Sequence, residues 1–140
     1  MKKRIIAVVA VVVIALSVLC SHSIAAVSEN PDTMFPQNII ITSCDRDFKI
    51  NSSGGLYLFG LTSVPSGYKA EVIVELQRYD GGWRRVTEYS ATGAYNAIVD
   101  EDITPARGYL YRLKLSHKAY NSSWVLLETI TKYSEEIEYF

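Results

Sequence analysis

The chain has 140 residues, of which 14 are Lys or Arg and 15 are Asp or Glu, so its net charge is −1 at neutral pH. A chain of this balance, with no basic stripe, does not attract the phosphate backbone of a nucleic acid, and we expect no nucleic-acid partner.

Residues 1–26 are predicted to be a cleaved secretory signal peptide. Lys2, Lys3 and Arg4 precede an uncharged apolar run over residues 5–19, and small residues favour cleavage near Ala25 or Ala26. A membrane-spanning helix needs about 20 apolar residues, so we expect no stable membrane span after cleavage. An uncleaved anchor and a lipoprotein modified at Cys20 are the alternatives. We expect a secreted, extracellular protein, either free or associated with the cell surface.

Cleavage of the predicted signal peptide changes the net charge of the chain and removes one cysteine and one histidine. Of the 14 basic and 15 acidic residues, three basic ones leave, so the exported chain has 11 basic against 15 acidic residues and a net charge of −4. Cys44 and His117 become the only cysteine and histidine. No internal disulfide can form, and one cysteine with one histidine cannot make a closed zinc site. We therefore expect no metal and no cofactor, and about 114 residues suit one domain.

After an extended lead-in over residues 27–37, residues 38–133 are predicted to alternate between strands and turns. Turn formers occupy residues 51–55, 80–82 and 121–123, and residues 100–108 are predicted to be a loop. Residues 134–140 are expected to be an acidic tail that frays. The predicted strands cover residues 39–42, 56–61, 70–79, 83–90, 95–99, 109–117 and 124–133.

Two of these segments show the alternation of a strand with one wet face. Val72, Val74 and Leu76 alternate with polar residues in 70–79, and residues 109–117 alternate in the same way. Asp80-Gly81-Gly82 supplies the positive φ angles of a tight hairpin turn. Seven short strands at regular spacing, without a helix, indicate an all-β sandwich or barrel.

Residues 108–112 favour the sandwich. Gly108-Tyr109-Leu110-Tyr111-Arg112 follows a loop and opens a strand, and it resembles the tyrosine corner of fibronectin type III and related immunoglobulin-like modules. The resemblance implies a seven-stranded antiparallel immunoglobulin-like β-sandwich over residues 38–133. In it, the hydroxyl of Tyr109 or Tyr111 bonds back to the loop backbone.

Two longer segments resemble a particular group of proteins. "LQRYDGGWRRV" and "GYLYRLKLSHKAY" are similar to segments of short, uncharacterised exported proteins of Gram-positive bacteria. This resemblance implies the compartment and the fold, and it implies no particular activity.

The candidates for catalysis and metal binding have ordinary structural interpretations. His117 is expected at a strand end on the margin of the core, and nothing in the sequence places it beside Cys44. Asp100-Glu101-Asp102, in the predicted loop, could offer oxygen ligands to Ca²⁺, as could Asp45 and Asp47, but a solvated surface is expected for both groups. An enzyme built on Cys44 or on carboxylates is the least favoured hypothesis.

Glu71 and Glu75 are the candidate carboxylate pair for glycoside hydrolysis. They share a strand face about 13 Å apart, which is too far for that reaction. We expect them to be part of a solvated face.

Aromatic residues form the remaining candidate site. Tyr79, Trp83 and Tyr89 flank the central hairpin, and Trp83 and Tyr89 share strand parity. Exposed aromatics on a sheet stack on sugars or anchor a protein partner, whereas a buried Trp83 would only pack the hairpin or core. The favoured hypothesis is a non-enzymatic protein that binds a protein or glycan through these residues. The alternative is a structural or inhibitory protein that acts by edge-strand pairing.

Overall fold

The structure, a computed structural model, describes residues 40–140. The predicted signal peptide (1–26) and lead-in (27–37) lie outside the described residues. The described part is all-β, with eight strands in two antiparallel sheets. Sequence analysis predicted seven strands, so that count was wrong by one.

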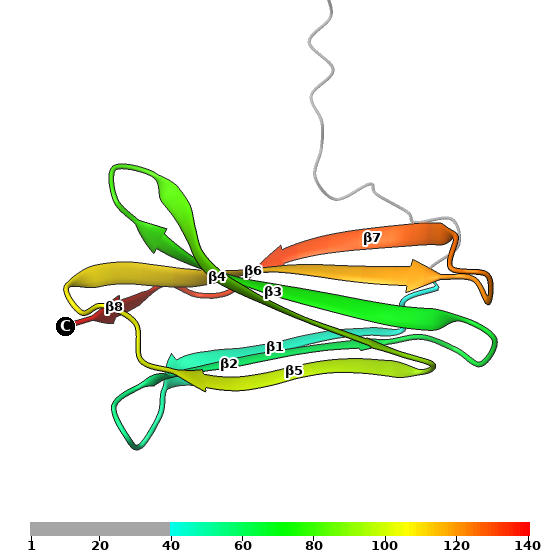
Figure 1. The fold of residues 1–140 in the computed structure, drawn as a ribbon, viewed down its shortest axis with the longest axis horizontal. Helices are drawn as coiled ribbons and strands as arrows, with labels where there is room; N and C mark the ends of the chain where they lie inside the picture. Colours follow the sequence, from blue (N-terminus) through cyan, green and yellow to red (C-terminus); the bar gives the residue numbers. More distant parts are fainter. Residues whose placement is uncertain (1–39) are drawn as a thin grey trace, which may run out of the picture. The chain divides into compact units, whose positions relative to one another are not determined.

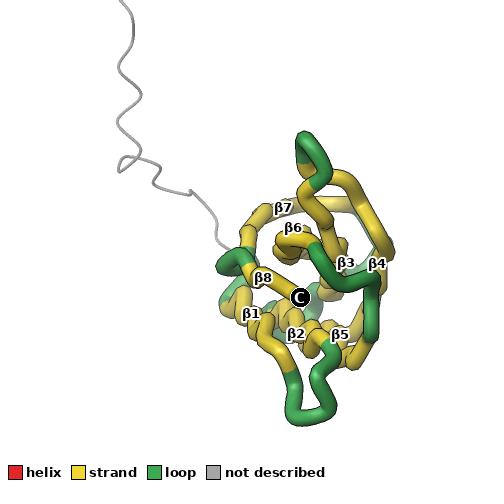
Figure 2. The backbone as a smooth tube through the Cα atoms, turned by 90° about the vertical axis from the view of Figure 1, so that its left-hand side faces the viewer, coloured by secondary structure: helices red, strands yellow, loops and turns green. Residues whose placement is uncertain are grey.

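The two sheets form two layers (Figures 1 and 2). One sheet has the order β1 (Ser43–Ile50), β2 (Leu56–Ser63), β5 (Asn96–Ile103). The other has the order β4 (Trp83–Gly93), β3 (Lys69–Tyr79), β6 (Tyr109–Tyr120), β7 (Leu126–Tyr133), and β8 (Ile137–Tyr139) also pairs with β6.

The core lies between the layers and is built from alternate residues of the central strands. Leu58 of β2, Val72 and Val74 of β3, and Leu113 and Leu115 of β6 are all fully buried. The predicted alternation in β3 and β6 is thus confirmed. Burying one face of each sheet against the other removes apolar surface from water, which is the main force that holds two such layers together.

Gly60 in β2 lets the layers approach closely. A Cβ atom at this position would lie 2.7 Å from Cγ2 of Val74 and 3.0 Å from Cδ2 of Leu115. Only a residue without a side chain fits there.

The first predicted strand, residues 39–42, was wrong where the structure describes it. Ile40, Ile41 and Thr42 precede β1, which begins at Ser43, where pairing with Ser63 starts. The backbone N–H groups of Ile40 and Ile41 donate instead to the Glu128 carboxylate of β7 at 2.8 and 2.9 Å. Thr42 N–H donates to Ser63 O at 2.9 Å, but the continuous ladder with β2 begins only at Ser43. Strand propensity is therefore not sufficient without a neighbouring strand to pair with.

The C-terminal residues differ from the expected fraying tail. Tyr139 in β8 is only 1% exposed. Its carbonyl accepts from Gly108 N–H at 2.7 Å, and its hydroxyl donates to Gly54 O at 2.8 Å. Ile137 and Tyr139 are two positions apart, so both face the core in β8. The acidic residues around them made this strand pattern hard to recognise in the sequence.

Two predicted local features are present. Asp80 N–H donates to Gly82 O at 2.9 Å in the β3–β4 hairpin, where Gly81 has φ 67°. The Tyr111 hydroxyl donates to Ala106 O at 2.6 Å, the contact expected of a corner tyrosine.

Candidate functional site

Tyr79 and Trp83 lie together on the outer face of the five-stranded sheet. They are directly opposite each other across the β3–β4 hairpin, with ring centroids 5.5 Å apart at 66°. Tyr79 is 48% exposed, and Trp83 is half-buried. The structure therefore brings together two of the three aromatic residues predicted as a site.

Tyr89, the third, lies on the opposite face. Leu76 pairs with Thr87, and the next residue, Gln77, pairs with Arg85, so Val86 is an extra residue in β4. A β-bulge of this kind reverses which face the following residues occupy. Tyr89 pairs with buried Val74 and packs against the core. The expectation from parity that Trp83 and Tyr89 share a face was wrong for this reason.

Arg112 and Tyr133 complete the cluster on the outer face. The Arg112 guanidinium carbon lies 4.0 Å from the Trp83 ring centre and 4.4 Å from that of Tyr133. Arg112 Nε also donates to Gln77 Oε1 at 2.8 Å, which fixes the guanidinium between the two rings. We call Tyr79, Trp83, Arg112 and Tyr133 the aromatic–arginine surface. Sequence reasoning missed Arg112 and Tyr133 because they come from β6 and β7, and only the sheet order places β6 beside β3 and β7 beside β6.

This arrangement limits what Trp83 can bind. The guanidinium on the Trp83 ring forms a cation–π contact, worth about 0.5–2 kcal/mol, that a stacking sugar would have to displace. Trp, Tyr and Arg are also the residue types that most often dominate protein–protein binding energy. The surface therefore carries residue types that are common at protein interfaces, and Arg112 covers one face of the Trp83 ring.

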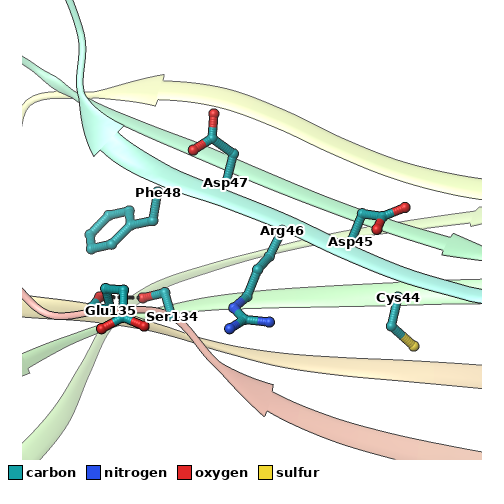
Figure 3. A pocket seen from close by; sticks show the side chains of 7 residues that line it. All are labelled: Cys44, Asp45, Arg46, Asp47, Phe48, Ser134 and Glu135. Atoms are coloured by element: carbon teal, nitrogen blue, oxygen red, sulfur yellow. Dashed lines mark hydrogen bonds between the residues drawn. The ribbon is translucent and has the colours of Figure 1, made fainter.

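A pocket of about 400 Å³ opens beside β1. Figure 3 shows Cys44, Arg46 and Phe48 pointing from β1 toward the other sheet, with Ser134 and Glu135 nearby and Asp45 and Asp47 turned away. Burial raises the pKa of the Cys44 thiol. A nucleophilic cysteine needs a lowered pKa, so the environment of Cys44 is the reverse of an activating one.

His117 is in the interior of β6 and is fully buried, not at a strand end on the core margin as expected. Its Nδ1 lies 2.9 Å from Thr62 Oγ1, a contact that joins the two sheets. Among residues 40–140, no hydrogen-bond partner is present for its Nε2. Burial and the positive charge of Lys132 lower the pKa of His117 to about 4, so the ring is neutral at ordinary pH.

The acidic candidates lie on the outer face of the three-stranded sheet. Asp100 and Asp102 belong to β5, so the predicted loop over residues 100–108 was wrong for its first four residues. They share a face with Asp45 and Asp47 of β1, because both strands pair with β2 between them. Two strand spacings, about 10 Å, separate the pairs. Within the described residues, no group of three potential ligands could hold a metal ion.

Glu71 and Glu75 lie on the outer face of β3 and contact their neighbours. Lys118 Nζ is 3.2 Å from Glu71 Oε2, and Tyr120 donates its hydroxyl to the same carboxylate. Burial and this bond raise the pKa of Tyr120 to about 12. Glu75 accepts from Gln77 at 2.6 Å.

A second apolar surface lies at the β6–β7 turn. Trp124, Val125, Leu126 and Leu127 are consecutive and 46–55% exposed, and we call them the apolar tip. Trp124 has φ 62°, an uncommon conformation for a bulky residue, and Lys69 Nζ lies 4.4 Å from its ring centre. This run of four apolar residues after a turn is visible in the sequence, whose pattern predicts only a strand over residues 124–133.

No protein-family model, curated protein or solved structure matches the chain. Residues 40–140 contain no helix that could span a membrane.

Proposed function

We propose that the chain is a secreted, non-enzymatic binding protein with an immunoglobulin-like β-sandwich, and that it contacts a protein partner outside the cell. The observation that carries this proposal is the aromatic–arginine surface, in which Tyr79, Trp83, Arg112 and Tyr133 lie contiguously on one face. Secretion rests on the predicted signal peptide.

Two features support the immunoglobulin-like assignment. The chain crosses between the sheets from β2 to β3, from β4 to β5 and from β5 to β6, which suits a sandwich rather than a simple meander. Tyr111 bonds back to the loop carbonyl of Ala106, five residues earlier. We also propose that the chain belongs to the group of short exported proteins of Gram-positive bacteria, on the strength of the two sequence segments that resemble them.

A protein partner is preferred to a glycan because of what covers Trp83. Arg112 occupies one face of the indole, and Tyr79 contacts it edge-on. The Arg112 guanidinium is held by Gln77, so the surface is preorganised and loses little side-chain entropy on binding. The absence of enzymatic activity is supported by the raised pKa of Cys44 and the buried neutral His117.

The test compares Trp83→Ala and Arg112→Ala with the wild type. The exported chain is applied to a glycan array, and it is used to isolate a partner from the surface proteins of the producing cell, against which it is then titrated. We expect no glycan binding, and we expect each variant to bind the isolated partner about tenfold or more weakly. Val86→Ala is the matched control, because Val86 is an exposed residue of the same strand and is not one of the four residues of this surface.

Two results would reject the proposal. Glycan binding by the wild type that Trp83→Ala abolishes would assign the surface to sugars. Equal partner affinity for Trp83→Ala, Val86→Ala and the wild type would show that the partner binds elsewhere.

Edge-strand pairing is the second candidate function, and it is favoured by the position of β7. Among the strands of residues 40–140, β7 ends its sheet, and its apolar residues Leu126 and Leu127 are exposed. An open, apolar strand edge is a template for another strand.

A further inference from the structure

We propose that β7 pairs antiparallel with β7 of a second copy of this chain, joining the two five-stranded sheets into one. This inference develops the edge-strand candidate and does not depend on the aromatic–arginine surface binding a partner. It commits to one register, in which the two-fold axis passes beside Ile130.

Within the part of the chain that the structure describes, β7 pairs only with β6, and its outward backbone groups lie where this register needs them. Ser134 N–H donates to Leu113 O of β6 at 3.0 Å. Backbone groups alternate in direction along an antiparallel strand, so the N–H groups of Thr129, Thr131 and Tyr133 point away from β6. With the axis at Ile130, Thr129 faces Thr131 of the second copy, and both present these free groups to each other.

The charges of β7 select this register. Its only charged residues are Glu128 and Lys132, two positions on either side of Ile130. The register places Glu128 of one copy directly opposite Lys132 of the other, twice by symmetry. Shifting the axis to Thr129 or Thr131 would leave both charges without an opposite partner. Glu128 and Lys132 already contact the backbone of Ile41 and Cys44, which holds their side chains on the inner face.

The apolar residues fit the same register. Leu127 of one copy lies opposite Tyr133 of the other, and these side chains are each 46% exposed. Because a two-fold axis normal to the sheet keeps both outer faces on one side, the dimer would also place two aromatic–arginine surfaces side by side.

The other free edges are unsuited to self-pairing. β5 carries Asp100, Glu101 and Asp102 in succession, so two copies would repel each other. β4 carries adjacent Arg84 and Arg85 and a bulge at Val86. β1 alternates charges through Asp45–Asp47 and points Arg46 inward. Charged residues and bulges are the usual protection of strand edges, and β7 lacks the charge repulsion that would provide it.

Sedimentation equilibrium of the exported chain tests the proposal. We expect a monomer–dimer equilibrium for the wild type. Lys132→Glu places two acidic residues opposite each other in each pair and should weaken the dimer by about tenfold or more. The double variant Glu128→Lys/Lys132→Glu restores opposite charges and should return the dimer constant to within a few-fold of the wild type. Lys114→Glu, on neighbouring β6, makes the same charge change and should have no effect.

Several outcomes would overturn the proposal. A wild type that stays monomeric up to its solubility limit rejects it, and so does a double variant that fails to recover. A dimer that tolerates Lys132→Glu but is lost in Val125→Asp would place the interface on the apolar tip instead. If circular dichroism shows that Lys132→Glu does not fold, Thr131→Pro tests the proposal instead. This variant removes an outward N–H group that does not bond to β6, and it should yield a folded monomer.

Discussion

His117 shows how a single buried side chain can make stability depend on pH. Its imidazole bridges β6 and β2 through Thr62, and burial holds it neutral. The pKa of His117 falls from 6.5 to about 4 in the folded protein. Below pH 6.5 the unfolded chain therefore binds a proton that the folded chain does not, so the folded state loses stability as the pH falls toward 4.

We expect His117 to contribute a loss of about 3 kcal/mol in the free energy of unfolding between pH 6.5 and pH 4. Urea unfolding across this range, for the wild type and for His117→Gln, measures it. The free energy of unfolding of the variant should decline less steeply, because it lacks the imidazole whose pKa is shifted. The carboxylates are common to both proteins, so their contribution cancels in the comparison. Parallel pH profiles would contradict the assignment.

Tyr111 makes a second prediction about single residues. Tyr111→Phe removes the hydroxyl that donates to Ala106 O and leaves that carbonyl without this partner. We expect the free energy of unfolding to fall by about 1–2 kcal/mol. Tyr109→Phe is the matched control and should change it by less than about 0.5 kcal/mol. Chemical denaturation measures both, and equal effects would remove the special role of Tyr111.

At the scale of elements, the separation of the two sheets depends on Gly60. Gly60→Ala would push its Cβ against Val74 and Leu115, side chains packed in the core. Overpacking of this kind should lower the free energy of unfolding by about 1–3 kcal/mol. Gly82→Ala, whose Cβ would meet nothing within 4 Å, should change it by less than about 0.5 kcal/mol.

Thermal unfolding of the two glycine variants measures the difference. A Gly60→Ala protein as stable as Gly82→Ala would mean that the layers separate slightly at little cost.

At the scale of the whole molecule, Tyr139 fastens the C-terminal strand to the opposite layer. Its ring packs against Tyr111 with centroids 6.1 Å apart, and its hydroxyl reaches Gly54 in the β1–β2 turn. One residue near the end of the chain thereby links β8, the core and the three-stranded sheet.

Tyr139→Ala should lower the free energy of unfolding by about 3–5 kcal/mol, because it leaves a large cavity and removes the bond to Gly54. Phe140→Ala is the matched control, since that side chain is 71% exposed, and it should have little effect. Equilibrium denaturation distinguishes them. Similar stability of both variants would restore the expectation that residues 134–140 are a fraying tail.

The sequence by itself determined the all-β class, the central hairpin and the buried faces of β3 and β6. These features depend on local alternation and turn residues, which act within one or two strands. The choice of Tyr109 or Tyr111 as the corner tyrosine came instead from the resemblance of residues 108–112 to fibronectin type III and related modules. Trp83 and Tyr79 were placed together correctly, because the three-residue turn Asp80-Gly81-Gly82 between them leaves little freedom in which residues face each other.

Only the tertiary structure decided which residues form the aromatic–arginine surface and which terminal segments belong to the sheets. The bulge at Val86 moved Tyr89 to the core face, and the sheet order brought Arg112 and Tyr133 to Trp83. Strand partners also decided that Ile40–Thr42 stay outside β1 and that Tyr139 is buried. Each of these outcomes depends on which strand lies next to which, and that is set by long-range pairing rather than by neighbours in the chain.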